Sequence, residues 1–409
     1  MIQRLKNIAL HIRNMNASGK TKTFSEIPSE LQPTSAISTE LVSLRKALIN
    51  GLENPYCVKG IVLLEVCENE VANVTRISRN CWHLTIDLGK RLISDWSLGS
   101  CHKIDVDASI RLTAEAIHLL VYNNNNIDFR DPELMGHIVF SGKLSLVGHV
   151  ARAMVSPSPS AIERLNWATH RTDTKYDVTD IERIEHPTEF EILKKLGDGM
   201  PFIIVRNATY DKQPTWTLND LRDKFSNTLL RVRSADWKET VGEFIDRIEL
   251  SLATRFVENP VDGFTKVYTE GCALPEAMKQ YFLPYFFTLD DYIEPQIWLG
   301  SVSTDIPASS LHRDPLDGFL YQLIGRKKIL MYSPDQMPFL YPVKAWNNYQ
   351  ACWVKPENPR LDLFPDFSNA HAIEVTLHPG EILVQPAGWF HVVSCLDSPT
   401  FSISYFYAR

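Results

Sequence analysis

A histidine and an aspartate separated by one residue, His312 and Asp314, lie near the start of a run of expected short strands. His391 follows Asp314 by 77 residues, again among expected strands. Two imidazoles and one carboxylate are the ligand set that holds non-haem iron(II) and leaves coordination positions open. Residues i and i+2 of a strand share a face, so His312 and Asp314 can point together while Arg313 points away. A metal site follows if His391 faces them.

The His-x-Asp spacing by itself is a weak signal, because such pairs arise by chance in a chain of this length. An ordinary hydrogen-bonded pair at a strand end is the alternative interpretation. The surroundings of His391 favour the metal site. Pro-Gly-Glu at 379–381 precedes an apolar strand, and Pro-Ala-Gly-Trp-Phe-His at 386–391 is typical of a tight turn that delivers a histidine to the next strand.

The part of the chain after about residue 180 is expected to contain many short strands and a few helices. Helices are predicted at 187–196, from 216 with Thr217 as the cap, and at 241–253. Strands are predicted at 181–184, 201–205, 229–233, 296–299, 319–324, 328–332, 372–377, 382–385, 390–394 and 400–407. In the last of these, apolar residues alternate with small or polar ones, which indicates a strand with one buried face. Short strands with Gly/Pro turns predict a jelly-roll sandwich or barrel.

The first 155 residues are expected to form an all-helical domain. Leu41, Leu44 and Leu48 recur at steps of three and four, and similar spacings occur in 76–96, 107–122 and 132–154. The segment Ser-Pro-Ser-Pro-Ser at 156–160 indicates a linker, because proline disfavours helix continuation. The predicted organisation is therefore a helical domain at 1–155, a linker at 156–179 and a strand-rich domain at 180–409, which together make an α+β protein.

The composition limits the classes of function and location. The net charge of −7 argues against non-specific nucleic-acid binding, which needs a basic face. The seven cysteines are scattered without a Cys-x-x-Cys motif, so we expect buried thiols in a reducing compartment, neither disulfides nor a zinc site. No apolar run is long enough to cross a membrane. We expect a cytoplasmic location, or a nuclear one if the source is eukaryotic. The basic, amphipathic N-terminus leaves a transit peptide open as an alternative.

From about residue 180 to Arg409 the chain resembles the JmjC-type, cupin-fold Fe(II)/2-oxoglutarate oxygenases. Within them it resembles the small hydroxylase branch that includes factor inhibiting HIF and lysine demethylase eight. The resemblance rests on Ser-Ser-Leu-His-Arg-Asp-Pro at 309–315, Gly-Arg-Lys at 325–327, Tyr-Ser-Pro at 332–334 and the segment 379–391. It implies a double-stranded β-helix in which His312, Asp314 and His391 hold Fe(II) and are the catalytic residues.

The resemblance also implies that 2-oxoglutarate chelates the iron and that O₂ is the second substrate. The distal carboxylate then needs a buried cation, and Lys327, fifteen residues after His312, matches the family lysine. A buried ammonium–carboxylate pair costs less than either ion buried alone. Ser309 and Tyr268 match the hydroxyl donors to the same carboxylate. Trp298 matches an aromatic residue that lines the pocket, with a plain core tryptophan as the alternative.

One residue departs from the family pattern. The branch often has an asparagine near the 1-carboxylate of 2-oxoglutarate, six residues after the first histidine, where this chain has Gly318. The coordination mode of 2-oxoglutarate is therefore open. We expect Lys327 to be buried and its two neighbours, Arg326 and Lys328, to face solvent.

The resemblance implies hydroxylation of a C–H bond, most often on an arginine, asparagine, aspartate or histidine of a protein or peptide, with lysine demethylation less favoured. A small-molecule or amino-acid hydroxylase and a non-catalytic cupin binding module stay as alternatives, the latter favoured only by Gly318. Acidic residues near the expected mouth would suit a basic target, unless they are an ordinary solvated surface; they are Asp290, Asp291, Glu294 and Asp317. The N-terminal domain would hold a protein partner or stabilise a homodimer.

Overall fold

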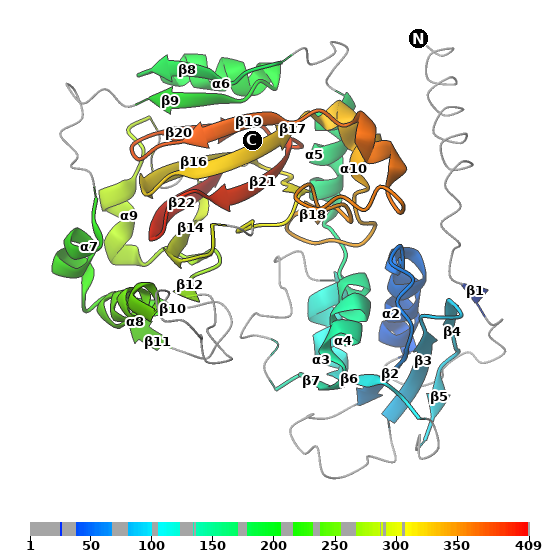
Figure 1. The fold of residues 1–409 in the computed structure, drawn as a ribbon. Coiled ribbons are helices and arrows are strands. Elements are labelled where there is room, and N and C mark those ends of the chain that lie inside the picture. Colours follow the sequence, from blue (N-terminus) through cyan, green and yellow to red (C-terminus); the bar gives the residue numbers. More distant parts are fainter. Residues whose placement is uncertain are drawn as a thin grey trace, which may run out of the picture. The chain divides into compact units, whose positions relative to one another are not determined.

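The structure is a computed structural model that describes residues 25–26, 38–67, 81–99, 105–122, 134, 136–170, 178–205, 216–231, 238–254, 267–286, 288, 292–304 and 307–407. The chain divides into two compact units, which are described separately (Figure 1). Unit 1 consists of Met1–Ile127, Leu134–Ser156 and Lys344–Trp346, and unit 2 of Asp128–Glu133, Pro157–Val343 and Asn347–Arg409. The described helices are all too short or too polar to cross a lipid bilayer.

Unit 1 is built around a β-sheet, so the prediction of an all-helical domain is wrong. Its described strands are β1 (Ser25–Glu26), β2 (Ile61–Cys67), β3 (Cys81–Asp87), β4 (Leu92–Ile93), β5 (Ser97–Leu98), β6 (Ala108–Thr113) and β7 (Ile138–Gly142). They run in the order β1-β4-β3-β2-β6-β7, with β5 paired to β3. The helices are α2 (Ser38–Gly51), α3 (Ala114–Ile117), the π-helix η1 (His118–Tyr122), α4 (Leu144–Ala151) and the 3₁₀-helix η3 (Arg152–Met154).

The error has a physical reason, because a spacing of four residues satisfies both the helical period and the period of two. Trp82 and Ile86 are four apart, yet they lie in β3, where Leu84 and Ile86 are buried and Trp82 is half-buried. In β6 the buried Ala108, Ile110 and Leu112 alternate with more polar residues in the same way. The helix predicted around Leu41, Leu44 and Leu48 is confirmed as α2, and all three leucines are fully buried.

A disulfide joins β2 to β3, which corrects the expectation that the cysteines are all free thiols. Cys67 and Cys81 are opposite each other in the antiparallel ladder, with their Cα atoms 4.6 Å apart, and their sulfur atoms are bonded. This separation is within the range that a disulfide spans. The pairing was not evident in the sequence because it depends on the register of two strands. Four other described cysteines are free thiols.

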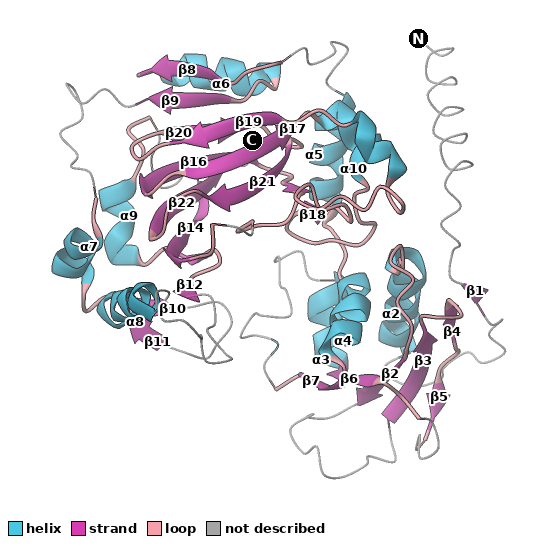
Figure 2. Ribbon diagram, viewed as in Figure 1, coloured by secondary structure: helices cyan, strands magenta, loops and turns pink. Residues whose placement is uncertain are grey.

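Unit 2 contains two sheets of the predicted jelly-roll (Figure 2). The larger sheet has the order β12-β14-β22-β16-β20-β9-β8 with β13 paired to β14, and the smaller has the order β18-β15-β21-β17-β19. Their strands are β8 (Glu182–Glu185), β9 (Phe202–Val205), β12 (Val267–Tyr268), β13 (Cys272–Ala273), β14 (Tyr292–Ser301), β15 (His312–Arg313), β16 (Asp317–Ile324), β17 (Lys327–Tyr332), β18 (Gln350–Ala351), β19 (Ile373–Leu377), β20 (Ile382–Gln385), β21 (Phe390–Cys395) and β22 (Thr400–Tyr407). A separate hairpin pairs β10 (Leu229–Arg231) with β11 (Lys238–Thr240).

The helices of unit 2 agree with the predictions over 187–196, after 216 and over 241–253. They are α5 (Pro159–His170), α6 (Glu189–Asp198), α7 (Leu218–Phe225), α8 (Val241–Thr254), α9 (Glu276–Phe282), α10 (Met337–Leu340) and the 3₁₀-helices η5 (Pro334–Gln336) and η6 (Pro365–Asn369). Thr217 caps α7 as expected, in a capping box with Asp220. Helix α5 occupies much of the predicted linker, and its Ala161, Leu165 and Ala168 are buried, so these residues are a packed element.

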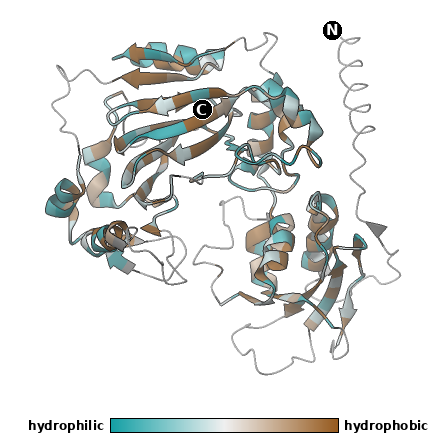
Figure 3. Ribbon diagram, in the orientation of Figure 1, coloured by the Kyte–Doolittle hydropathy of each residue, from teal (hydrophilic) through white to brown (hydrophobic). Residues whose placement is uncertain are grey.

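The two faces of the larger sheet of unit 2 meet different partners. Phe401, Ile403 and Tyr405 of β22 belong to the core cluster that also holds residues of α6 to α9. Leu320 and Leu383 face the other way and pack with Ile329 and Met331 of the smaller sheet. The inner side of β22 is polar instead, because the intervening residues are Ser402 and Ser404. Figure 3 shows apolar residues along these strands and a largely hydrophilic α7.

A glycine allows β14 to approach β12 closely. Gly300 has a φ of 155°, and a Cβ atom at this position would lie 1.9 Å from the carbonyl oxygen of Val267. Gly300 pairs directly with Tyr268, and Trp298 lies two residues before it on the same strand. The positions of Tyr268 and Trp298, two predicted pocket residues, therefore depend on a glycine at position 300.

We expect Gly300→Ala to lower the free energy of unfolding by about 3 kcal/mol or more, because the β12 backbone has to move. Urea unfolding followed by tryptophan fluorescence measures this. Gly197→Ala is the control: Gly197 is in α6 and nothing lies within 4 Å of an added Cβ. This control should be stabilising by about 0.5–1 kcal/mol. If the two substitutions changed the free energy of unfolding equally, the close approach of β14 to β12 at Gly300 would be contradicted.

Candidate metal centre

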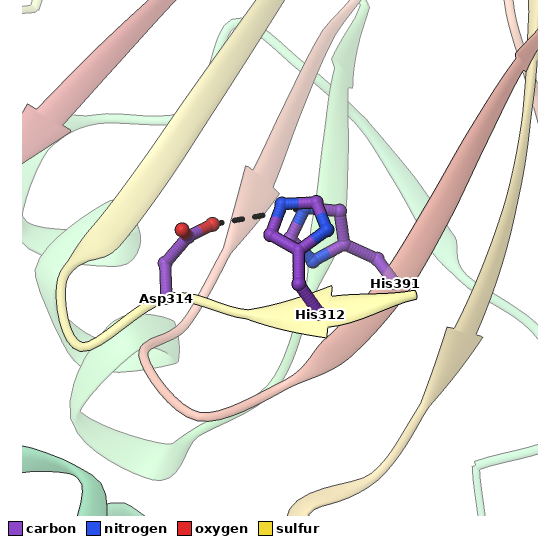
Figure 4. Close-up of side chains that lie close together, drawn as sticks. All are labelled: His312, Asp314 and His391. Atoms are coloured by element: carbon purple, nitrogen blue, oxygen red, sulfur yellow. Dashed lines mark ion pairs between the residues drawn. The ribbon is translucent and has the colours of Figure 1, made fainter. Parts of the chain in front are cut away.

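His312, Asp314 and His391 converge, as their spacing predicted. His312 and His391 are directly opposite each other in the antiparallel pairing of β15 with β21. Their ring centroids are 4.1 Å apart, and Nε2 of His391 lies 3.6 Å from Oδ2 of Asp314. One ligand atom from each of the three residues lies within 4.8 Å of the others. Figure 4 shows the three side chains pointing toward one another from two chain segments.

Backbone hydrogen bonds hold the His-x-Asp segment against the turn before His391. The N–H of Gly388 donates to the carbonyl oxygen of Asp314 at 2.9 Å, and the N–H of Ala387 donates to Oδ1 of Asp317 at 2.9 Å. Gly388 has a φ of 86°, and a Cβ there would lie 2.7 Å from the side chain of Ala168 in α5. The turn thus carries a glycine where both its conformation and its packing require one.

The role expected for Asp317 as a recognition charge at the mouth is therefore wrong. Its side chain is buried and bonded to the Ala387 backbone, so it stabilises the turn. Asp290, Asp291 and the side chain of Glu294 lie outside the described residues.

The ring of His312 is oriented by its own chain. Nδ1 of His312 donates to the carbonyl oxygen of Ser310 at 2.6 Å. With its proton on Nδ1, a neutral imidazole presents the lone pair of Nε2, which is the form that binds a metal.

The ring of His391 is oriented by Gln385, a residue that the sequence analysis missed. The amide nitrogen Nε2 of Gln385 lies 2.6 Å from Nδ1 of His391 and donates to it. The ring proton is then on Nε2, which faces Asp314. If Nε2 held a metal, the ring proton would be on Nδ1, and the Gln385 amide, rotated by half a turn, could accept it with its oxygen.

Burial shifts the protonation of the cluster toward neutral forms. It raises the pKa of the Asp314 carboxyl, an effect that His312 opposes. It lowers the pKa of His391 well below its usual range, with His312 adding to the effect. His391 is therefore a neutral imidazole near neutral pH, as a metal ligand must be. A bound divalent cation would offset the cost of burying the carboxylate.

The donor set fits an Fe(II) ion. Both histidines can present Nε2, and Asp314 can present a carboxylate oxygen; these are two neutral nitrogen donors and one anionic oxygen donor on one side of a cation. This is the composition of the facial triad, in which the remaining positions stay open.

Lys327 is buried in the barrel, as expected from the resemblance. It is 2% exposed, and its ammonium donates to the hydroxyl oxygen of Ser402. No carboxylate forms an ion pair with it in the described chain, and burial lowers its pKa to about 8. Arg326 and Lys328 are more exposed than Lys327, as predicted, and they form ion pairs with Asp397 and Glu374. A buried cation with one neutral partner fits a carboxylate ligand.

Tyr268 and Trp298 lie together in a small cluster with Cys395. Their ring centroids are 6.1 Å apart, and Cys395 packs in the same cluster. Cys395 is also the register partner of Lys327 between β21 and β17. Burial raises the pKa of Tyr268 well above its usual range, so its phenol stays a hydrogen-bond donor. The indole of Trp298 donates to the hydroxyl oxygen of Ser404 at 2.8 Å.

Ser309 lies at the edge of β21. Its hydroxyl oxygen accepts from the N–H of Val393 at 3.2 Å, and its own N–H donates to the carbonyl oxygen of Val393. Its neighbour Ala308 packs against the cluster that contains Tyr268. The structure thus connects Ser309 to the strand that carries both His391 and Cys395.

Ser402 and Ser404 were missed, although the sequence carried a signal for them. They are the polar members of the alternation in β22, and they face the side opposite to the apolar core.

At Gly318, an added Cβ would lie 3.7 Å from the ring of Phe406, an ordinary contact. The space beside Gly318 is therefore bordered by an aromatic ring of β22.

Comparisons with known proteins agree with this geometry. Residues 185–409 match the family model described as a cupin-like domain. Lysine-specific demethylase 8 from Danio rerio is 33% identical over 302 residues, 67% of this chain and 72% of that protein. The same-named protein from Xenopus tropicalis is 31% identical over 185 residues, 44% of this chain and only 40% of that protein. JmjC domain-containing protein D from Dictyostelium discoideum is 40% identical over 115 residues, which are 28% of this chain and 25% of that protein.

The matched family segment includes β15 and β21, the strands that bring His312 opposite His391. The chain therefore belongs to the cupin-like JmjC family.

Proposed function

We propose that this protein is an Fe(II)- and 2-oxoglutarate-dependent oxygenase that hydroxylates a C–H bond on a protein or peptide side chain. The convergence of His312, Asp314 and His391 within 4.8 Å carries the proposal. A structural histidine–aspartate pair would not need a third ligand from a strand 77 residues away. The buried ammonium of Lys327, which has no carboxylate partner among the described residues, supports the co-substrate part of the proposal.

The residues have separate roles in the proposed site. His312, Asp314 and His391 would hold Fe(II), with Gln385 and the Ser310 carbonyl orienting the two rings. Lys327 and the phenol of Tyr268 would bind the distal carboxylate of 2-oxoglutarate, with Ser309 as a further hydroxyl. The indole of Trp298 would form a wall of the pocket. With iron and 2-oxoglutarate bound, the site would supply oxidising chemistry that consumes O₂, releases succinate and CO₂, and adds one oxygen atom to the substrate.

The protein's own contribution is to position the substrate and to exclude water. The lining described above is largely apolar or hydrogen-bonded within the protein, since Tyr268, Cys395 and Lys327 are all buried. A dry pocket strengthens the attraction between the Lys327 ammonium and a carboxylate.

We propose that the target is an arginine, asparagine, aspartate or histidine side chain. This choice of substrate rests on the resemblance to the family. Two relatives are named lysine-specific demethylase 8, so demethylation is the second candidate. Mass spectrometry separates the two, because hydroxylation adds one oxygen atom and demethylation removes one methylene unit.

Turnover of 2-oxoglutarate tests the proposed function directly. We expect succinate release that requires added Fe(II), and a fall to background in His312→Ala because a metal ligand is lost. His371→Ala is the matched control, since His371 is an exposed histidine outside the site. A wild-type protein that neither binds Fe(II) nor releases succinate with any peptide or amino-acid pool would refute the enzyme proposal.

Gln385→Leu tests the orientation of His391. The leucine fills a similar space but cannot pair with Nδ1, so we expect metal affinity to fall about 10–100-fold. Titration with Mn(II), read by isothermal calorimetry, measures this without turnover. Gln336→Leu is the control, because Gln336 bonds to Ser333 and the His371 backbone. An unchanged affinity in the Gln385 variant would show that the ring needs no such partner.

The pKa of Lys327 predicts how the KM for 2-oxoglutarate depends on pH. Burial lowers the free-state pKa of Lys327 to about 8, whereas a bound carboxylate favours the charged form and raises it. Above the free-state pKa, binding must take up a proton. The KM should therefore be flat below about pH 7 and rise up to tenfold per unit above about pH 8. Lys328→Met should keep this profile, and a flat profile in the wild type between about pH 7 and 10 would contradict the role.

A further inference from the structure

Tyr349 lies beside the metal centre and was not singled out by any motif. Its ring centroid is 5.0 Å from that of His312, with 67° between the ring planes. In such an edge contact at least one face of the phenol ring stays uncovered by His312. The side chain is 38% exposed, whereas His391 is buried at 8%. Tyr349 therefore lies beside a proposed metal ligand and is partly accessible to solvent.

The position of Tyr349 is held by the strand that follows it. Gln350 and Ala351 form β18, which pairs with Arg313 and His312 of β15. The N–H of Cys352 donates to the carbonyl oxygen of Leu311 at 2.9 Å. Tyr349 is thus connected by the backbone to β15, which carries His312 and directly precedes Asp314.

Arg313, the residue between those two ligands, fixes β18 through its side chain. Its Nε donates to Oε1 of Gln350 at 2.8 Å, and one terminal nitrogen donates to Oγ1 of Thr169 in α5 at 3.0 Å. The guanidinium also lies 4.9 Å from the ring centroid of Phe390. The amide of Gln350 in turn donates to the carbonyl oxygen of Val343 at 2.8 Å. The guanidinium is buried, so these bonds are costly to break.

We propose that Tyr349 is a specificity-determining residue of the oxygenase site, whose open ring face stacks on the planar end group of the substrate side chain. This inference rests on the proposed function and narrows its substrate class to guanidinium, amide or imidazole groups. A preorganised aromatic ring favours planar groups over branched aliphatic groups, because only a flat partner contacts the whole face. Fixing β18 beforehand lowers the entropic cost of that contact.

The probe is a synthetic peptide library in which one central position is arginine, asparagine, histidine or leucine, incubated with the Fe(II)-loaded full chain and 2-oxoglutarate. We expect an added oxygen atom on peptides with planar side chains. Tyr349→Leu should raise the KM for these peptides about tenfold, with a smaller effect on kcat, whereas Tyr349→Phe should stay within about twofold of the wild type. Tyr281→Leu is the matched control, because Tyr281 is 45% exposed on α9.

The outcomes separate the inference from the function on which it rests. If the wild type oxidises peptides but prefers leucine, or if Tyr349→Leu leaves the KM unchanged, the stacking role is wrong and the oxygenase proposal stands. If Tyr349→Leu instead abolishes Mn(II) binding, the ring only supports His312 and the inference is overturned. If the wild type neither turns over 2-oxoglutarate nor binds Fe(II), the proposed function fails and the inference with it.

Discussion

The antiparallel pairing of β15 with β21 is the constraint on which the site depends. It puts His312 opposite His391, and Asp314, which directly follows β15, lies beside both of them. The Gly388 hydrogen bond to the Asp314 backbone fixes the same register from the turn. A slip of one residue would send His391 to the opposite face and separate the three side chains. The geometry of the cluster is thus a property of the sheet.

Burial makes this geometry useful but also costly. It keeps His391 neutral, raises the pKa of Asp314 and lowers that of Lys327. Each shift is caused mainly by burial, and the charged forms of Asp314 and Lys327 would be favoured by a nearby opposite charge. A divalent cation beside Asp314 and a carboxylate beside Lys327 would supply those charges, so the two binding steps and the electrostatics support one another. Arg313 is the exception, since its neutral acceptors already hold it in a structural role.

Much of the strand-rich unit was predictable from local patterns. The alternation in β22, the cap at Thr217 and the Pro-x-Gly-Trp-x-His turn each depend on a few neighbouring residues, and each was predicted correctly. The first unit was predicted incorrectly because Trp82, Ile86 and Ile110 occur at spacings that suit both a helix and a strand. The neighbouring strands decided between the helical period and the strand period, because β3 and β6 both pair with β2.

The sequence by itself determined which chemistry was available: two histidines and an aspartate at strand spacing, a lysine at a fixed offset, and a glycine turn. Only the tertiary structure decided how these groups are oriented and what surrounds them. Tyr349 reaches the site because β18 pairs with β15, far from it in the sequence, and the disulfide between Cys67 and Cys81 depends on the same kind of strand register. Such contacts leave no local pattern, because the partner of a strand is not encoded in the strand alone.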